Sequence, residues 1–252
     1  LIKINELIKE GKKLIVADST SITDIEQLAL AIKKCDKKLL PTGTAAGAQV
    51  LAKYWLAGIE REKETLKLEK LPKFIVSGTA THITAEQIAK LEQSDDIDNV
   101  NFIPLETKDI IAGVSNELVE RILTNLKANV TVVVHTSHLI ANFDGFSDDS
   151  FNAELTKNKL ASMITDYLAE LTERVLAEVN AVLITLGGET SYKCCKAINS
   201  NELKLLDEVV PAISICSDIH KRWIVTKSGN LGNTKTLIDI LDYFKHHEQI
   251  CE

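Results

Sequence analysis

Residues 181–198 read AVLITLGGETSYKCCKAI, an apolar run followed by two glycines and a polar stretch. The run at 182–186 is short, apolar and rich in β-branched residues, which is typical of a buried strand. Gly187 and Gly188 interrupt it, and Glu189 opens a segment of helical composition. The sequence therefore predicts a strand, a tight glycine turn and the first turn of a helix.

A second glycine loop lies between an apolar run at 223–226 and a helical stretch at 233–244. Its residues are Lys227, Ser228, Gly229, Asn230, Leu231 and Gly232. A strand-to-helix junction binds phosphate because glycine lets the backbone approach the ligand, while free N–H groups and the helix dipole face the anion. A glycine pair by itself is more often a plain turn than a ligand site, but the lysine that begins the second loop can neutralise phosphate charge. We therefore predict one phosphate site formed by both loops, although Lys227 precedes the glycines and the loop is not a Walker A motif.

The composition is that of an ordinary globular protein of one or two domains, with 252 residues, 45% hydrophobic and 26% charged. A net charge of −7 argues against nucleic acid or an anionic membrane as a partner. The five cysteines form no CxxC pair and are odd in number, which favours reduced thiols. With no long apolar run and no signal-peptide core, we expect a soluble, cytoplasmic protein. The sequence starts at Leu1, so we expect a processed product or a fragment.

The first part of the chain predicts three helices, at 1–10, 23–34 and 45–56, the second with a capping box of Thr23 and Glu26. Strands are predicted at 14–17 and 39–40, each followed by a polar turn, at Asp18 and at 42–47. Eight of the eleven residues at 60–70 are charged. Such a stretch marks a linker, which we place at 58–71.

A new alternation follows, with strands at 74–76, 100–103, 130–134 and 209–215 and helices at 84–92, 115–127 and 152–178. Thr84 and Ser115 are the expected helix caps. In the long loop 135–150, His135 and His138 could face a metal, but no third ligand is evident and an exposed polar loop is favoured. The alternation predicts an α/β fold, an open and mostly parallel sheet with helices on both faces.

Most glycines fall in the predicted strand-to-helix turns. Seven of the 11 do so, namely Gly43, Gly47, Gly78, Gly187, Gly188, Gly229 and Gly232. Ligands of open α/β sheets bind at the carboxyl ends of strands. The glycine turns therefore mark the expected ligand face.

Three short motifs in order resemble the four-carbon acid sugar kinase family. FIVSGT at 74–79, with Thr84 and Gln87, matches the family's "SGS…T..Q". GGET at 187–190 matches "GG[DE]T", and TKSGNLG at 226–232 matches "TKSGGFG". Thr79 in place of serine and Pro211-Ala212 in place of Pro-Gly depart from the family pattern.

The resemblance implies ATP-dependent phosphorylation of a hydroxyl of an acid of the threonate, erythronate or 3-oxo-tetronate type, with Mg²⁺. Residues 1–57 then correspond to the last part of an acid-sugar-binding domain, with Asp18, Gly43 and Thr44 as substrate-binding residues. Residues 72–252 correspond to the nucleotide-binding domain, and Glu189 is the implied magnesium contact. The implied nucleotide-binding residues are Ser77, Gly78, Thr79, Gly187, Gly188, Glu189, Thr190, Lys227, Ser228, Gly229, Asn230, Leu231 and Gly232.

No catalytic base is visible, and the resemblance places it in an N-terminal part that carries an Asp-Asp-x-Thr-Gly motif not found in this sequence. The alternative hypothesis is a nucleotide- or phosphate-binding module without catalytic activity. The acid, its stereochemistry and the oligomeric state, including whether the chain forms a homodimer, are left open by the sequence.

Overall fold

A computed structural model describes residues 1–58, 66–78, 81–95, 97–139 and 157–249. The chain divides into two compact units, Leu1–Glu64 (unit 1) and Thr65–Glu252 (unit 2). As functional domains, the divisions 1–57, 58–71 and 72–252 stay predictions.

Unit 1 contains three helices, α1 (Ile2–Lys9), α2 (Ile22–Lys33) and α3 (Ala45–Trp55), as the sequence predicts. The capping box predicted for α2 is wrong in its residues. Ser21 Oγ accepts from the Asp24 amide at 3.2 Å, and the Asp24 carboxylate accepts from the Ser21 amide at 2.9 Å. The same carboxylate also accepts from the Thr20 amide, so it satisfies two free backbone donors ahead of the helix.

The two strands predicted in unit 1, at 14–17 and 39–40, are wrong. Within the described residues of this unit no segment pairs with them as a strand. Leu14, Val16 and Leu40 are 84%, 81% and 92% exposed. A strand needs a hydrogen-bonded neighbour to cover its backbone, and an apolar run without one stays irregular.

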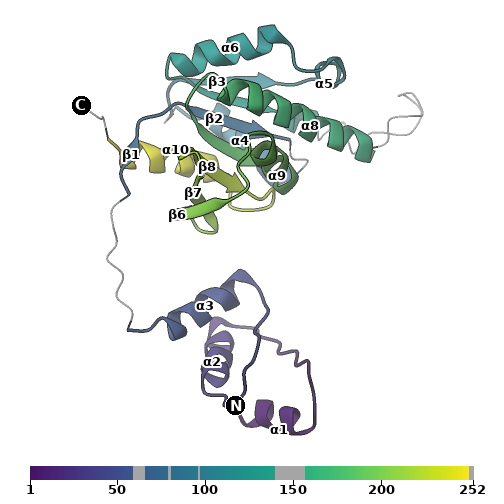
Figure 1. Cartoon of the computed structure of the whole chain (residues 1–252), viewed down its shortest axis with the longest axis vertical. Helices are drawn as coiled ribbons and strands as arrows, with labels where there is room; N and C mark the ends of the chain where they lie inside the picture. Colours follow the sequence, from purple (N-terminus) through teal and green to yellow (C-terminus); the bar gives the residue numbers. More distant parts are fainter. Residues whose placement is uncertain (59–65, 79–80, 96, 140–156, 250–252) are drawn as a thin grey trace. The chain divides into compact units, whose positions relative to one another are not determined.

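Unit 2 is built on a seven-stranded sheet with the order β3-β4-β2-β5-β8-β7-β6 (Figure 1). The first five strands of this order are parallel, and β7 and β6 are antiparallel to their neighbours. This confirms the predicted fold class. The strands are β2 (Lys73–Ser77), β3 (Val100–Pro104), β4 (Thr131–His135), β5 (Val182–Leu186), β6 (Leu203–Val210), β7 (Ile213–Asp218) and β8 (Trp223–Lys227).

The single strand predicted at 209–215 is wrong, because a hairpin turn lies inside it. Pro211 and Ala212 separate β6 from β7, and Ala212 has a φ of 66°. Pro211 has no backbone N–H to donate to a neighbouring strand, so β6 ends before it. The positive φ of Ala212 reverses the chain, and β7 begins at the next residue.

Helices cover both faces of this sheet, as predicted. One face carries α5 (Thr107–Ala112), α6 (Asn116–Lys127), α8 (Lys157–Leu176) and α9 (Gly188–Ala197), and the other carries α4 (His82–Glu92) and α10 (Thr236–His247) (Figure 1). Side chains alternate across β2, where Phe74 and Val76 join the first core and Ile75 joins the second. Strands buried on both faces must be apolar throughout, which is why the runs in the sequence are continuous rather than alternating.

A second, two-stranded sheet joins the two ends of unit 2. The short strands β1 (Leu68–Glu69) and β9 (Glu248–Gln249) pair in parallel, and Lys73 forms an ion pair with Glu248. β1 lies inside the stretch predicted as a linker. His247, at the end of the last helix, is half-buried with its ring stacked 4.1 Å from that of Tyr243.

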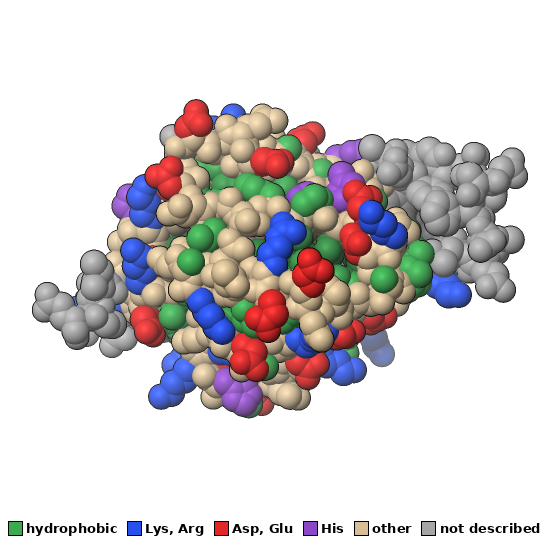
Figure 2. Space-filling view, turned by 90° about the horizontal axis from the view of Figure 1, so that it is seen from above, with side chains coloured by type: hydrophobic (Ala, Val, Ile, Leu, Met, Phe, Trp, Pro, Cys, Tyr) green, Lys and Arg blue, Asp and Glu red, His purple; other side chains and the backbone are tan. Residues whose placement is uncertain are grey.

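Charged side chains of both signs are interspersed over the face shown in Figure 2. An anionic ligand on a protein with a net charge of −7 must therefore be held by local donors. Among the described residues, no helix has both the length and the hydrophobicity that a membrane span requires.

Candidate functional site

The strands β2, β5 and β8 end side by side at the carboxyl edge of the sheet. Ser77 lies opposite Leu186, and Leu186 lies opposite Lys227 in the strand register. The Gly187 amide donates to the Lys227 carbonyl at 2.8 Å, which ties the glycine turn to the second loop. The structure thus brings the three sequence motifs to one edge.

The glycine turn and the first turn of α9 present free backbone donors. Gly187 has a φ of 112°, a conformation that favours glycine, and α9 begins at the next residue. The amides of Gly188, Glu189 and Thr190 donate to no other described residue, as expected for a helix N-terminus. A Cβ at Gly188 would meet nothing within 4 Å outside its chain neighbours and the backbone of its own helix, so the space at the Cβ position of this glycine is open.

Side-chain donors hold carbonyl groups of the second loop, and that of Asn233 directly after it, toward α4. Thr84 Oγ1 donates to the Gly229 carbonyl at 2.7 Å. Gln87 Nε2 donates to the carbonyls of Leu231 and Asn233 at 3.0 and 2.8 Å. Within one peptide unit, the C=O of a residue and the N–H of the next residue point in opposite directions. The amides that follow these bonded carbonyls therefore point away from α4.

Several amides of this loop have no partner in the part of the chain that the structure describes. They belong to Gly229, Asn230 and Gly232. Ser228 and Asn230 are exposed, whereas Leu231 is half-buried and packs against the second core. Together with the N-terminus of α9, the loop can present a concentration of backbone donors to an anion.

Thr84 does not cap α4, and that prediction was wrong. The helix begins at His82 with Thr81 as N-cap, and Thr84 is fully buried in its first turns. Its hydroxyl accepts from Lys227 Nζ at 3.1 Å in addition to donating to Gly229. The threonine that the sequence suggests as a helix cap instead supports the loop.

Lys227 is the last residue of β8 and is fully buried. Its Nζ donates to Thr84 Oγ1, the Ser228 carbonyl at 2.9 Å and the Gly229 carbonyl at 3.3 Å. Burial lowers the pKa of this ammonium to about 8. The positive charge therefore lies beneath the loop, where it fixes two carbonyl groups.

Ser77, the last residue of β2, is fully buried, and its Oγ has no hydrogen-bond partner among the described residues. Its carbonyl accepts from the Thr136 amide at 3.1 Å. Leaving a buried hydroxyl unpaired costs about 1–3 kcal/mol, so Ser77 is a polar group at the carboxyl edge of the sheet whose hydrogen-bonding capacity is unused among the described residues.

Gly78 has a packing role beside any contact with a ligand. A Cβ there would lie 2.8 Å from Leu168 Cδ1 and 3.0 Å from Thr190 Oγ1, so a larger residue would push α8 away. Thr190 is buried in the first turn of α9. Thr79 lies outside the described residues.

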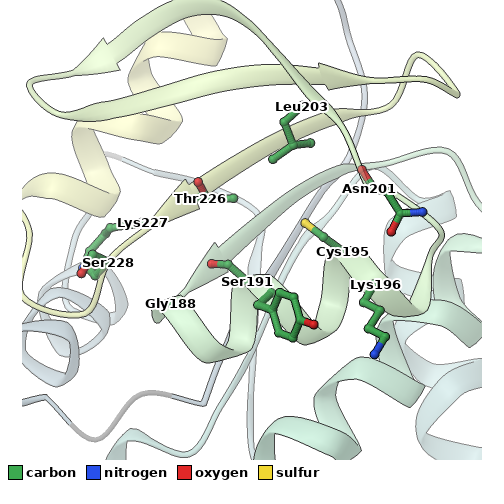
Figure 3. Close-up of a pocket in the computed structure, with 11 residues that line it drawn as sticks. Gly188, Ser191, Cys195, Lys196, Asn201, Leu203, Thr226, Lys227 and Ser228 are labelled. Carbon is green, nitrogen blue, oxygen red and sulfur yellow. The ribbon is translucent and has the colours of Figure 1, made fainter.

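A cavity of about 510 Å³ opens next to the glycine turn, between α9 and the strands β8 and β6 (Figure 3). Sequence reasoning missed most of its lining. The only available signal was the recurrence of positions 188, 191, 192, 195 and 196 on one side of a predicted helix. The lining residues are Gly188, Ser191, Tyr192, Cys195, Lys196, Ser200, Asn201, Leu203, Thr226, Lys227 and Ser228.

Glu189 is exposed in the first turn of α9. In the described ranges no group of three His, Cys, Asp or Glu side chains could hold a metal ion. The role of Glu189 as a magnesium contact therefore stays a prediction.

The prediction that His135 lies in an exposed polar loop was wrong. His135 ends β4, is buried, and shares a hydrogen bond of 2.7 Å between its Nδ1 and Ser137 Oγ. Burial and the neighbouring His138 lower its pKa to about 4. It is neutral near pH 7 and belongs to the packing of this edge.

The three residues predicted to bind substrate, Asp18, Gly43 and Thr44, lie in unit 1 and are exposed. Thr44 is the N-cap of α3 but makes no side-chain capping hydrogen bond. Their role in binding an acid stays a prediction.

Comparison with known proteins gives a family match and several distant relatives. The model of the nucleotide-binding C-terminal domain matches residues 74–237. The chain is 24% identical to D-erythronate kinase of Heliobacterium modesticaldum, over 92% of this chain and 54% of that protein. It is 22% identical to D-threonate kinase of Salmonella typhimurium, over 96% of this chain and 56% of that protein.

Among solved structures, Haemophilus influenzae protein HI1011, of the family DUF1537, is similar in fold. It has a TM-score of 0.69 and 19% identity, with 96% of this chain and 56% of the other covered. The chain thus spans about half the length of the curated relatives it matches.

Proposed function

Four-carbon acid sugar kinases are the family to which this chain belongs, with its nucleotide-binding C-terminal domain at residues 74–237, and on that premise we propose that the chain binds ATP. In this proposal it is the nucleotide-binding half of a kinase that phosphorylates a hydroxyl of a threonate, erythronate or 3-oxo-tetronate type of acid. The proposal includes a cytoplasmic location, in which cysteines stay reduced. The four described cysteines are free, which agrees with it.

The observation that carries this proposal is the orientation of the second loop. Side chains of α4 and Lys227 hold its carbonyls on the inside, which supports a role for its free amides in binding phosphate. The N-terminus of α9 adds further donors and the positive end of a helix dipole. Phosphoryl transfer requires mainly such positioning and charge neutralisation from the protein.

The remaining residues take roles that follow from their positions. Ser77 would donate its unpaired hydroxyl to a phosphate oxygen, and Glu189 would hold Mg²⁺ against the phosphates. The metal would supply neutralisation of phosphate charge. Residues of the acid-sugar-binding domain would bind the sugar acid. They would also supply the base that accepts the proton of its hydroxyl.

We predict that ADP affinity falls as pH rises through about 8 because of Lys227. Its ammonium attracts the phosphates only while it is protonated, and its pKa in the free protein is about 8. Above that pH, binding must take up a proton, so Kd should rise by up to about tenfold per pH unit. Calorimetry with Mg-ADP from pH 7 to 9 measures this slope.

The slope should disappear in Lys227→Met, which replaces the ammonium by an apolar side chain of similar length. Lys90→Met is the matched control, since Lys90 is exposed on α4 and should leave the profile unchanged. A parent protein whose ADP affinity is constant from pH 7 to 9 would contradict this role of Lys227.

A nucleotide-binding module without catalysis is the second candidate. The exposure of Asp18, Gly43 and Thr44 favours it. So does the small core of unit 1, in which Ala29 and Val50 are the only buried apolar side chains among the described residues. Turnover with an acid substrate distinguishes the two candidates.

A further inference from the structure

The cavity beside the glycine turn extends well beyond the phosphate donors. Its lining follows one side of α9 from Gly188 through Ser191 and Tyr192 to Cys195 and Lys196. Eight residues of α-helix separate Gly188 from Lys196, a distance of about 12 Å at 1.5 Å per residue. An inorganic anion would fill only the end at Gly188, so the cavity has room for a larger molecule that is anionic at one end.

The end of the cavity away from the glycine turn differs in chemistry from the phosphate end. Leu203 of β6 and Cys195 of α9 lie on opposite sides of it, and Asn201 lies at its edge (Figure 3). Tyr192 adds an aromatic side chain that is 61% exposed. Burial raises the pKa of the Cys195 thiol to about 11, so it is a neutral, weakly polar surface near pH 7. We call this end the apolar end; it is formed by Tyr192, Cys195, Lys196, Ser200, Asn201 and Leu203. Its one charged group, Lys196 Nζ, lies 5.9 Å from the centre of the Tyr192 ring.

One polar atom of the apolar end has no partner. Ser200 is only 4% exposed, and within the described part of the chain its Oγ makes no hydrogen bond. Native proteins rarely leave a buried hydroxyl unsatisfied. An unpaired hydroxyl among apolar walls suits a ligand that is flat and apolar on its faces and polar at its edge.

We propose that the apolar end binds the purine base of the nucleotide, with its faces against Leu203 and Tyr192 and its edge at Ser200 Oγ and Asn201. This inference rests on the proposed function, because the phosphates at the glycine turn set the direction in which the nucleotide lies. Ser200, Leu203 and Tyr192 thereby determine which base is accepted, whereas the glycine loops bind the phosphates of any nucleotide.

The test compares ADP with pyrophosphate, which has the same phosphates and no base. Leu203→Ala should weaken ADP binding about tenfold, the usual scale for removing a large apolar contact, and leave pyrophosphate affinity unchanged. Leu205→Ala is the matched control: it is another exposed leucine of β6, two residues further along and outside the cavity lining, and should change neither affinity.

Ser200→Ala provides an independent measurement at the edge of the base. Loss of one hydrogen bond should weaken ADP about three- to tenfold, again with no effect on pyrophosphate. ADP affinities equal to the parent's in both variants would overturn the base site, while pyrophosphate binding would still support the phosphate site. If neither ADP nor pyrophosphate binds the folded parent, the proposed function itself fails and this inference fails with it.

Discussion

Replacing Gly188 with valine is expected to abolish ADP binding while unit 2 stays folded. A Cβ built at Gly188 meets no atom within 4 Å outside its chain neighbours and the backbone of its own helix, so there is room for a side chain to begin here. We expect the valine side chain to occupy the place where phosphate would approach the free amides of α9. We expect Kd to rise more than about 100-fold, because several charge-assisted hydrogen bonds of about 1.5–3 kcal/mol each are lost together. Calorimetry measures the affinity, and circular dichroism and thermal unfolding check the fold.

A glycine in the first turn of another helix supplies the control. Gly47 lies in the first turn of α3 in unit 1, and a Cβ there also meets nothing within 4 Å. Gly47→Val should bind ADP like the parent. Normal ADP binding by Gly188→Val would mean that this glycine serves only the turn, and the phosphate site would have to lie elsewhere.

Transfer of phosphate from ATP to a four-carbon acid is expected only when this chain is joined to a complete acid-sugar-binding domain. In-line transfer requires the acceptor hydroxyl about 3–3.5 Å from the γ-phosphorus and a base nearby. The sequence has no arginine before Arg61 that could bind a carboxylate in two-point fashion. Asp18, Gly43 and Thr44 are all exposed in unit 1. The chain as given should at most hydrolyse ATP slowly.

A coupled assay of ADP release decides this, with threonate, erythronate and their 3-oxo relatives as acceptors. It is run on the present chain and on an extended version that carries a complete N-terminal domain. The extended version with Gly188→Val is the matched negative control, since it should bind the acid but not ATP. Acid-dependent turnover by the present chain would refute the requirement for two domains. If the extended chain releases no ADP with any of these acids, the nucleotide-binding module is favoured.

The sheet of unit 2 could be predicted because its strands are buried on both faces. The run at 74–76 is apolar throughout and the run at 182–186 is apolar except for Thr185, which is the pattern of a central parallel strand. The same rule failed at 14–17 and 39–40. There the residues are equally apolar, but a strand is defined by its neighbour, and no described segment of unit 1 supplies one.

The edge of the sheet at which the glycine loops lie could be predicted, but not the way in which the loops are held. Turns after parallel strands lie at one edge of a sheet, so Ser77, Gly187 and Lys227 were expected at the same edge, and the strand order makes them neighbours there. That Thr84 and Gln87 hold the carbonyls of a loop some 145 residues away depends on how α4 packs, which no local pattern encodes. Ser200 was missed because a serine in a polar turn is ordinary until its burial is known.

The pairing of β1 with β9 places the first and last strands of unit 2 side by side. Chain ends that meet in this way can be joined by a short linker without disturbing any strand of the main sheet. A circular permutant of unit 2 with new ends at an exposed turn would therefore keep both the seven-stranded sheet and the glycine loops. The same geometry lets a nucleotide-binding module be spliced into a host protein at a single surface loop, entering through β1 and leaving through β9.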